Sequence, residues 1–202
     1  MEILYQDPQI AVCVKPVGMD AEQETPQALR AALGGEIYPL HRLDKAVGGV
    51  MVFARTRSAA AQLSRAMQDG TFMKEYIALV HGAPPAEGVW EDLLWKDAKK
   101  NKVFVVKRMR GGVRPAKLSY TRLTQGDASL VAVRLYTGRT HQIRVQFASR
   151  GFPLLGDHKY GARDSIAAPM LFSRRITFPY AGKIRSFEAL PPWAELQNVK
   201  MP

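Results

Sequence analysis

Cysteine is almost absent from this 202-residue sequence, in which Cys13 is the only example. A single thiol excludes an internal disulfide and a zinc site built from several cysteines. The four histidines, His41, His81, His141 and His158, show neither the i, i+4 spacing nor the neighbouring carboxylates typical of a zinc site. We therefore expect no bound metal.

Long apolar runs are missing as well. No stretch approaches the roughly 18 residues that identify a membrane-spanning helix, and residues 1–7 lack the basic-then-apolar order of a signal peptide. Apolar residues nevertheless make up 47% of the chain, which is enough to bury a sizeable core. We expect a folded cytoplasmic protein with no membrane partner.

Acidic residues are scarce, with 18 Asp and Glu against 29 Lys and Arg, and the formal net charge is +11. The deficit is greatest in residues 99–122, which contain no acidic residue and nine basic ones: Lys99, Lys100, Lys102, Lys107, Arg108, Arg110, Arg114, Lys117 and Arg122. Such a surplus favours a polyanionic partner, RNA or DNA. The glycine pair at 111–112 predicts a hairpin whose tip, with Lys107, Arg108 and Arg110, contacts a phosphate backbone. A solvated charged face is the simpler alternative.

Short apolar runs and turn residues predict many strands and a few helices. Strands are expected at residues 2–6, 10–14, 48–54, 73–80, 102–106, 117–123, 129–136, 170–178 and 183–189, and helices at 25–33, 58–69 and 141–150. Thr25 and Thr140 are the expected N-caps of the first and last helix. This irregular order indicates an α+β fold around a mixed or mainly antiparallel sheet. With no repeat or linker, residues 1–202 are expected to form a single domain.

The segment His41-Arg42-Leu43-Asp44 precedes the predicted strand at 48–54. A loop aspartate that leads into a strand is positioned by the sheet yet open to a cleft, as catalytic residues often are. A turn or cap role is the simpler alternative for a loop aspartate. The segment also echoes the catalytic loop of protein kinases, but the glycine-rich nucleotide loop and Asp-Phe-Gly are absent, so we set that function aside.

A second segment, Thr137-Gly138-Arg139-Thr140-His141-Gln142-Ile143-Arg144, joins a predicted strand to a predicted helix. Arg139 and Arg144 would then lie near a helix start, where anions are bound favourably. For each arginine taken alone, an ordinary surface position is the simpler alternative.

Taken together, these segments resemble the motifs of the RluA-type pseudouridine synthases. The resemblance includes Lys74-Glu75-Tyr76 and the opening Lys15-Pro16-Val17-Gly18, in the family's order, and it extends over about residues 2–190. It implies an isomerase that converts uridine to pseudouridine in structured ribosomal or transfer RNA without a cofactor. The pseudouridine synthase fold is expected, here without a separate RNA-binding domain of the S4 type, in a monomer.

The resemblance also implies roles for individual residues. Asp44 would be the catalytic carboxylate, acting as nucleophile or base on the ribose or the uracil. Tyr76 would stack on the uracil, and Arg144 would pair with Asp44 and favour its ionised form. Arg42 would fill the space left by the flipped uridine. The remaining expected RNA contacts are His41, Arg139 and His141.

The sequence departs from the family pattern at two places. Val47-Gly48 replaces the usual Thr-Ser after Asp44, and Leu171-Phe172-Ser173 replaces Leu-His-Ala near the end of the chain. The loss of two hydroxyls beside Asp44 motivates an alternative, an RNA-binding or RNA-chaperone protein with reduced catalysis. A DNA-binding function is disfavoured because no helix-turn-helix or zinc-finger signature is present. The motifs leave the target uridine open.

Overall fold

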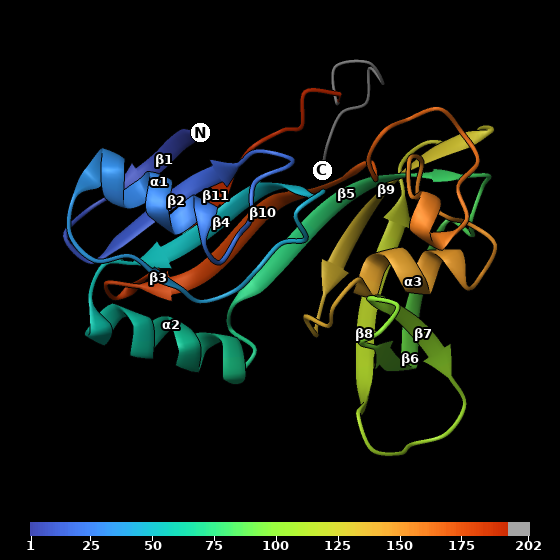
Figure 1. The fold of residues 1–202 in the computed structure, drawn as a ribbon, viewed down its shortest axis with the longest axis horizontal. Helices are drawn as coiled ribbons and strands as arrows, with labels where there is room; N and C mark the ends of the chain where they lie inside the picture. The colour runs from blue at the N-terminus through green and yellow to red at the C-terminus, as the bar shows by residue number, and fades with distance from the viewer. Residues whose placement is uncertain (194–202) are drawn as a thin grey trace. The chain divides into compact units, whose positions relative to one another are not determined.

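The computed structural model describes residues 1–193, which form an α+β structure as predicted (Figure 1). The chain divides into two compact units. Within the described residues, unit 1 comprises Met1–Glu75 and residues 172–193, and unit 2 comprises Tyr76–Leu171. The expectation that residues 1–202 form a single domain stays a prediction.

Unit 1 contains a mixed sheet with two helices. Its elements are β1 (Glu2–Gln6), β2 (Ile10–Lys15), α1 (Glu24–Leu33), β3 (Tyr38–Pro39), β4 (Gly48–Ala54), α2 (Arg57–Gln68), β10 (Leu171–Tyr180) and β11 (Lys183–Glu188). The strand order is β1-β2-β4-β10, with β11 on β10 and β3 on β4. The β4–β10 pair is parallel, and the other pairs of this unit are antiparallel.

The core of unit 1 explains why β4 reads as an unbroken apolar run. Every residue of β4 is buried, as is usual for a strand that is covered on both faces. Helix α2 packs its buried Ala59, Leu63 and Ala66 against Val50 and Val52 of β4. Thr56 caps α2 by accepting a hydrogen bond from the Ala59 N–H, so this helix begins where the sequence predicts.

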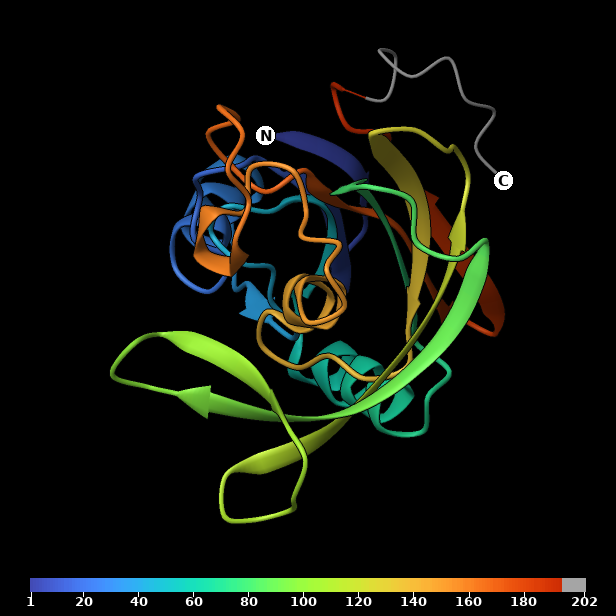
Figure 2. The same ribbon diagram turned by 90° about the vertical axis from the view of Figure 1, so that its right-hand side faces the viewer.

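Unit 2 is built on long antiparallel strands. Its elements are β5 (Met73–His81), which begins in unit 1, β6 (Glu87–Asp97), β7 (Lys102–Val106), β8 (Val113–Arg122), β9 (Ala128–Leu135), α3 (Gln142–Ala148) and the 3₁₀ turn η1 (His158–Tyr160). The strand order is β5-β9-β8-β6-β7. Helix α3 lies on one face of the curved strands β6 and β8 (Figure 2). Phe147 of α3 packs there against Trp90 and Tyr120.

Most predicted elements are present, but some local predictions are wrong. Strand β6 was not predicted, and it lies between β7 and β8, so residues 99–122 do not form a hairpin of their own. Helix α1 starts at Glu24 after Gln23, with Thr25 inside it. The Thr25 hydroxyl donates to the Asp20 carbonyl instead of capping the helix.

Within residues 1–193 no helix has the length and apolar character needed to cross a membrane.

Candidate active site

The loop that carries Asp44 is fixed by its own backbone and by two buried neighbours. Leu43 and Val47 are 6% and 2% exposed, so they anchor the loop in unit 1 on either side of the half-buried Asp44. The Val47 N–H donates to the Asp44 carbonyl at 2.9 Å, which closes a tight turn directly before β4. The carboxylate is therefore carried on a short, pinned connection at the start of a buried strand.

A buried lysine, Lys15, bonds to the backbone next to this loop. Lys15, at the end of β2, is fully buried, and its ammonium donates to the carbonyls of Pro16 and Met19 at 2.9 and 2.8 Å. The carbonyl of Lys45, next to Asp44, lies 3.5 Å from the same nitrogen. Burial lowers the pKa of Lys15 to about 8, while the charges of Asp20 and Asp44 act in the opposite direction. Sequence reasoning assigned no role to this lysine.

His41 has an internal role in the same unit. Its Nε2 accepts a hydrogen bond from the Val52 N–H at 3.2 Å, and its Nδ1 is buried. The ring lies 5.6 Å from the Phe72 ring. Burial, with the nearby charge of Lys74, lowers the pKa of His41 to about 3, so the ring is neutral. In the structure the His41 ring thus bonds to the backbone of β4, and the RNA contact expected from the sequence stays a prediction.

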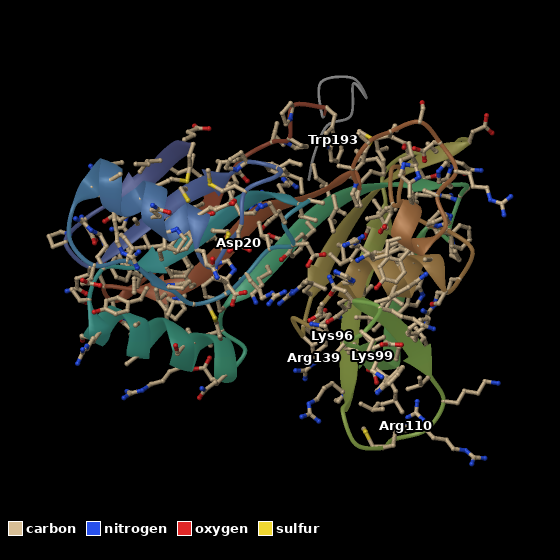
Figure 3. The ribbon with its side chains drawn as sticks, in the orientation of Figure 1. Asp20, Lys96, Lys99, Arg110, Arg139 and Trp193 are labelled. Atoms are coloured by element: carbon tan, nitrogen blue, oxygen red, sulfur yellow. The ribbon has the colours of Figure 1, made fainter. Side chains whose placement is uncertain are left out.

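Arg42 and Lys45 lie on the exposed side of the loop. Arg42 pairs with Glu22 at 3.0 Å, and Lys45 pairs with Glu24 at 3.2 Å. All four side chains are about half exposed or more, and ion pairs of this kind contribute at most about 1 kcal/mol. Little free energy is therefore needed to break either ion pair when an anion binds. Asp20, labelled in Figure 3, precedes both glutamates. Its carboxylate accepts hydrogen bonds from the Glu22 and Gln23 N–H groups.

Tyr76 is the first residue of unit 2 and lies in β5. It is only 7% exposed, and Lys74, two residues earlier, has its pKa lowered by burial. The Lys74 ammonium lies 5.7 Å from the centre of the Phe72 ring. The Lys-x-Tyr motif therefore lies where β5 passes from partly buried to buried positions. Partial burial of the Lys74 ammonium carries a desolvation cost.

The turn before α3 is organised by Gln142 instead of Thr140. The Gln142 Oε1 accepts from the Thr137 hydroxyl at 2.8 Å and from the Arg139 N–H at 3.0 Å. Its amide nitrogen donates to the Lys117 carbonyl at 3.1 Å. His141, with a φ of 51°, occupies the N-cap position without a side-chain cap bond. The predicted Thr140 cap is wrong because the chain enters the helix through this left-handed residue.

Arg144 is held by a carboxylate that the sequence did not assign. Its Nε and Nη2 donate to the two oxygens of Asp157 at 2.7 and 2.8 Å. The two side chains are 7% and 0% exposed, so this bidentate pair is buried. The guanidinium carbon also lies 5.2 Å from the centre of the Tyr160 ring. Arg144 and Asp157 are 13 positions apart in the sequence. Their contact depends on the conformation of the chain between them, which the sequence motif does not reveal.

The basic segment, residues 99–122, runs from the β6–β7 turn through β7 and the β7–β8 connection to the end of β8. Its β7–β8 connection, residues 107–112, is exposed throughout, and within residues 1–193 its Lys107, Arg108 and Arg110 form no ion pair. Arg110 packs over the Trp95 ring at 5.1 Å; Figure 3 labels it together with Lys96, Lys99 and Arg139. Arg139 is exposed, and its Nε donates to the Pro115 carbonyl. Part of the charge is compensated, because Lys117 pairs with Glu91 of β6 at 2.7 Å.

The sites predicted from the sequence thus fall into two groups. Unit 1 holds His41, Arg42 and Asp44, and unit 2 holds Tyr76, Arg139, His141, Arg144 and the cations of the β7–β8 connection. In the part of the chain that the structure describes, no group of three or more His, Cys, Asp and Glu side chains is arranged to hold a metal ion.

Comparison with known proteins places these motifs in a family. Residues 9–149 match the RNA pseudouridylate synthase family. The dual-specificity RNA pseudouridine synthase RluA of Escherichia coli is 33% identical over 205 residues, which cover 93% of this chain and 91% of that protein. The chain belongs to the RluA-type family of RNA pseudouridine synthases. Enzymes of this family are isomerases.

Other relatives agree. An uncharacterized RNA pseudouridine synthase of Chloroflexus aurantiacus is 38% identical over 83% of this chain, and the chain spans about half of that protein, 54%. The solved structure of human RNA pseudouridylate synthase domain containing 4 matches with a TM-score of 0.83, at 24% identity, over 100% of this chain and 94% of that one. The latter likeness confirms the predicted pseudouridine synthase fold.

The two departures from the pseudouridine synthase pattern contact each other. Gly48 of β4 is paired with Phe172 of β10, and Gly49 is paired with Ser173. A Cβ placed on Gly48 would lie 3.5 Å from the Phe172 ring and 3.2 Å from the Lys15 carbonyl. The Ser173 hydroxyl donates to the Val50 carbonyl at 3.1 Å. The bulkier Phe172 is thus accommodated by the missing side chain at 48, and a hydroxyl on β10 bonds to the backbone of β4.

Proposed function

We propose that this protein is an RNA pseudouridine synthase that isomerises uridine in structured RNA, with Asp44 as its catalytic carboxylate. The observation that carries the proposal is the support of Asp44, a family-motif aspartate on a pinned turn above a buried lysine. Burying the Lys15 charge next to this loop costs free energy. A solvent-exposed aspartate with only a turn or cap role would not require that cost.

The reaction breaks the bond between uracil N1 and ribose C1′ and forms a bond between C5 and C1′. C5 loses its proton and N1 gains one, so the isomerisation is balanced without an oxidant or an energy donor. A carboxylate can act as nucleophile or as base in such a sequence. We assign one of these roles to Asp44, on the ribose or on the uracil.

Two residues of unit 2 complete the proposed chemistry. Tyr76 would stack on the displaced uracil and could take part in proton transfer. Arg144 would pair with Asp44 and favour its ionised form, because an adjacent cation lowers a carboxyl pKa. The bidentate bond to Asp157 supports the role of Arg144, since it fixes the direction of the guanidinium plane.

The same proposal assigns RNA contacts. Arg42 would enter the space vacated by the flipped uridine, whose unstacking costs a few kcal/mol. Arg139 and His141 would contact the RNA backbone beside Arg144. Lys107, Arg108 and Arg110 would contact phosphates farther along the RNA, which agrees with their exposure and with the absence of ion pairs at these residues in the described chain.

The RNA itself is proposed from the relatives. A relative from Zymomonas mobilis, 32% identical over 95% of this chain, is named ribosomal large subunit pseudouridine synthase D, and RluA is named dual-specificity. We propose ribosomal or transfer RNA as the substrate, in the cytoplasm, with the protein acting as a monomer.

Mapping pseudouridines across cellular RNA tests this function and names the target together. We expect a strain lacking the chain to lose one or a few pseudouridines from ribosomal or transfer RNA. A plasmid copy of the wild type should restore them, and the Asp44→Asn variant should not. An unchanged map, with the gene expressed under the growth conditions used, would contradict the proposal.

The alternative of an RNA chaperone with reduced catalysis rests on the altered loop after Asp44. The contact of Gly48 with Phe172 weakens that motive, because the change in the loop is matched by a change on β10. The Asp44→Asn copy separates the two functions. A chaperone would restore growth or ribosome assembly equally well with either copy, without restoring any pseudouridine.

A further inference from the structure

Arg144 is held more tightly than a surface arginine of a recognition motif needs to be. Two of the five N–H donors of its guanidinium are committed to Asp157, in a pair that is almost entirely buried. Asp157 is placed by its own backbone, since its N–H donates to the Leu154 carbonyl and its carbonyl accepts from the Tyr160 N–H. The direction of the Arg144 head group is therefore determined by the loop that follows α3.

Tyr160 gives this arrangement a second contact and a link to the basic segment. Its ring lies 5.2 Å from the Arg144 guanidinium carbon, a cation–π distance. Its hydroxyl accepts from the Val103 N–H at 2.9 Å and lies 2.8 Å from His141 Nδ1. Val103 belongs to β7, and Lys102 beside it also lies over the Tyr160 ring at 5.3 Å. One side chain thus contacts Arg144, His141 and the first strand of the basic segment.

We propose that Asp157 and Tyr160 are positioning residues, which hold Arg144 in its reactive direction and tie that direction to strand β7. This inference rests on the proposed function, because it assigns Arg144 to the reaction. A misplacement of about 1 Å in a catalytic group can cost about a hundredfold in rate. The two residues should therefore affect the chemical step more than RNA binding.

Unit 2 offers a matched control for the Arg144–Asp157 pair. Arg150 donates to both oxygens of Asp92 at 2.9 and 3.1 Å, and its guanidinium stacks on the Trp90 ring at 4.3 Å. The pair has the same bidentate and aromatic chemistry, and Arg150 lies just beyond the same helix. It lies outside the family motifs, however. Loss of Asp92 reports the cost of breaking such a pair without touching the reaction.

The test compares Asp157→Asn, Tyr160→Phe and Asp92→Asn with the full-length wild type on the RNA identified by mapping. Single-turnover rates at saturating RNA, RNA Kd and thermal midpoints are measured for each protein. We expect Asp157→Asn to lower the rate by about tenfold or more, Tyr160→Phe to lower it by about threefold to tenfold, and both to keep Kd within about twofold. Asp92→Asn should keep the rate while lowering the thermal midpoint.

Equal rate losses for Asp157→Asn and Asp92→Asn would overturn the proposal, as would a wild-type rate for Asp157→Asn. Should Asp157→Asn fail to fold, Tyr160→Phe decides, because it keeps the ring against Arg144 and removes only the hydroxyl. An inactive wild type would instead count against the proposed function, and the inference would fall with it. The two failures are therefore distinguishable.

Discussion

At the scale of single residues, the support of Asp44 depends most on Lys15. This side chain donates to the carbonyls of Pro16 and Met19 and approaches that of Lys45. Replacement by Met keeps the length of the side chain but leaves these carbonyls without their donor, at a cost of about 1–3 kcal/mol for each buried unsatisfied group. Removing the buried charge offsets part of that cost.

The pH dependence of stability separates the loss of the Lys15 hydrogen bonds from the removal of its buried charge. The folded pKa of Lys15 is lowered to about 8 by burial, whereas an unfolded lysine titrates near about 10.4. Between these values the unfolded chain binds more protons, so wild-type stability rises with pH relative to Lys15→Met. Thermal midpoints of both proteins between about pH 7 and 10 measure the difference. A constant difference across this range would show that Lys15 keeps an ordinary pKa.

At the scale of elements, the β4–β10 pair tests whether the two departures from the family pattern are coupled. Gly48→Ser should destabilise the protein by about 1–3 kcal/mol, because the added atoms meet the Lys15 carbonyl and the Phe172 ring. In the background of Phe172→His the same change should cost less, by about 0.5 kcal/mol or more. Urea unfolding of the two single variants and the double variant measures the coupling, and additive costs would argue against it.

The β7–β8 connection makes its own prediction. Alanine at Lys107, Arg108 and Arg110 should weaken RNA binding and reduce the slope of log Kd against log salt by about 0.7–0.9 for each phosphate that these side chains neutralise. Alanine at Arg57, Arg65 and Lys183, which are exposed in unit 1, removes the same charge elsewhere. We expect this control to leave the slope close to that of the wild type. Equal slopes for the two triple variants would mean that net charge alone, and no local contact, attracts the RNA.

The elements also show what the sequence can predict. β2, β4 and α2 carry strong apolar patterns, and their predicted positions agree with the structure. β6 mixes acidic and apolar residues and has no such pattern. Its position as a strand depends on pairing with β7 and β8, which the residues of β6 alone do not reveal. The same holds for Asp157, whose link to Arg144 depends on the conformation of the intervening loop.

At the scale of the whole molecule, motif order was more informative than composition. A net charge of +11 favours a polyanionic partner without distinguishing RNA from DNA, whereas the ordered motifs predicted the family that the comparisons confirm. The roles of Asp44, Tyr76 and Arg144 were predicted from that resemblance and remain proposals. The structure adds the supports of two of them, Lys15 and Asp157, which no motif role had suggested.

Release of tritium from RNA labelled at uridine C5 shows whether Asp44 catalyses the isomerisation of uridine. Wild-type protein with labelled cellular RNA should release tritium to water in proportion to the pseudouridine formed, because the C5 proton leaves when C5 bonds to C1′. The Asp44→Asn variant should bind the RNA with a similar Kd and release only the background level. If the wild type released no more tritium than Asp44→Asn, Asp44 would not be the catalytic carboxylate.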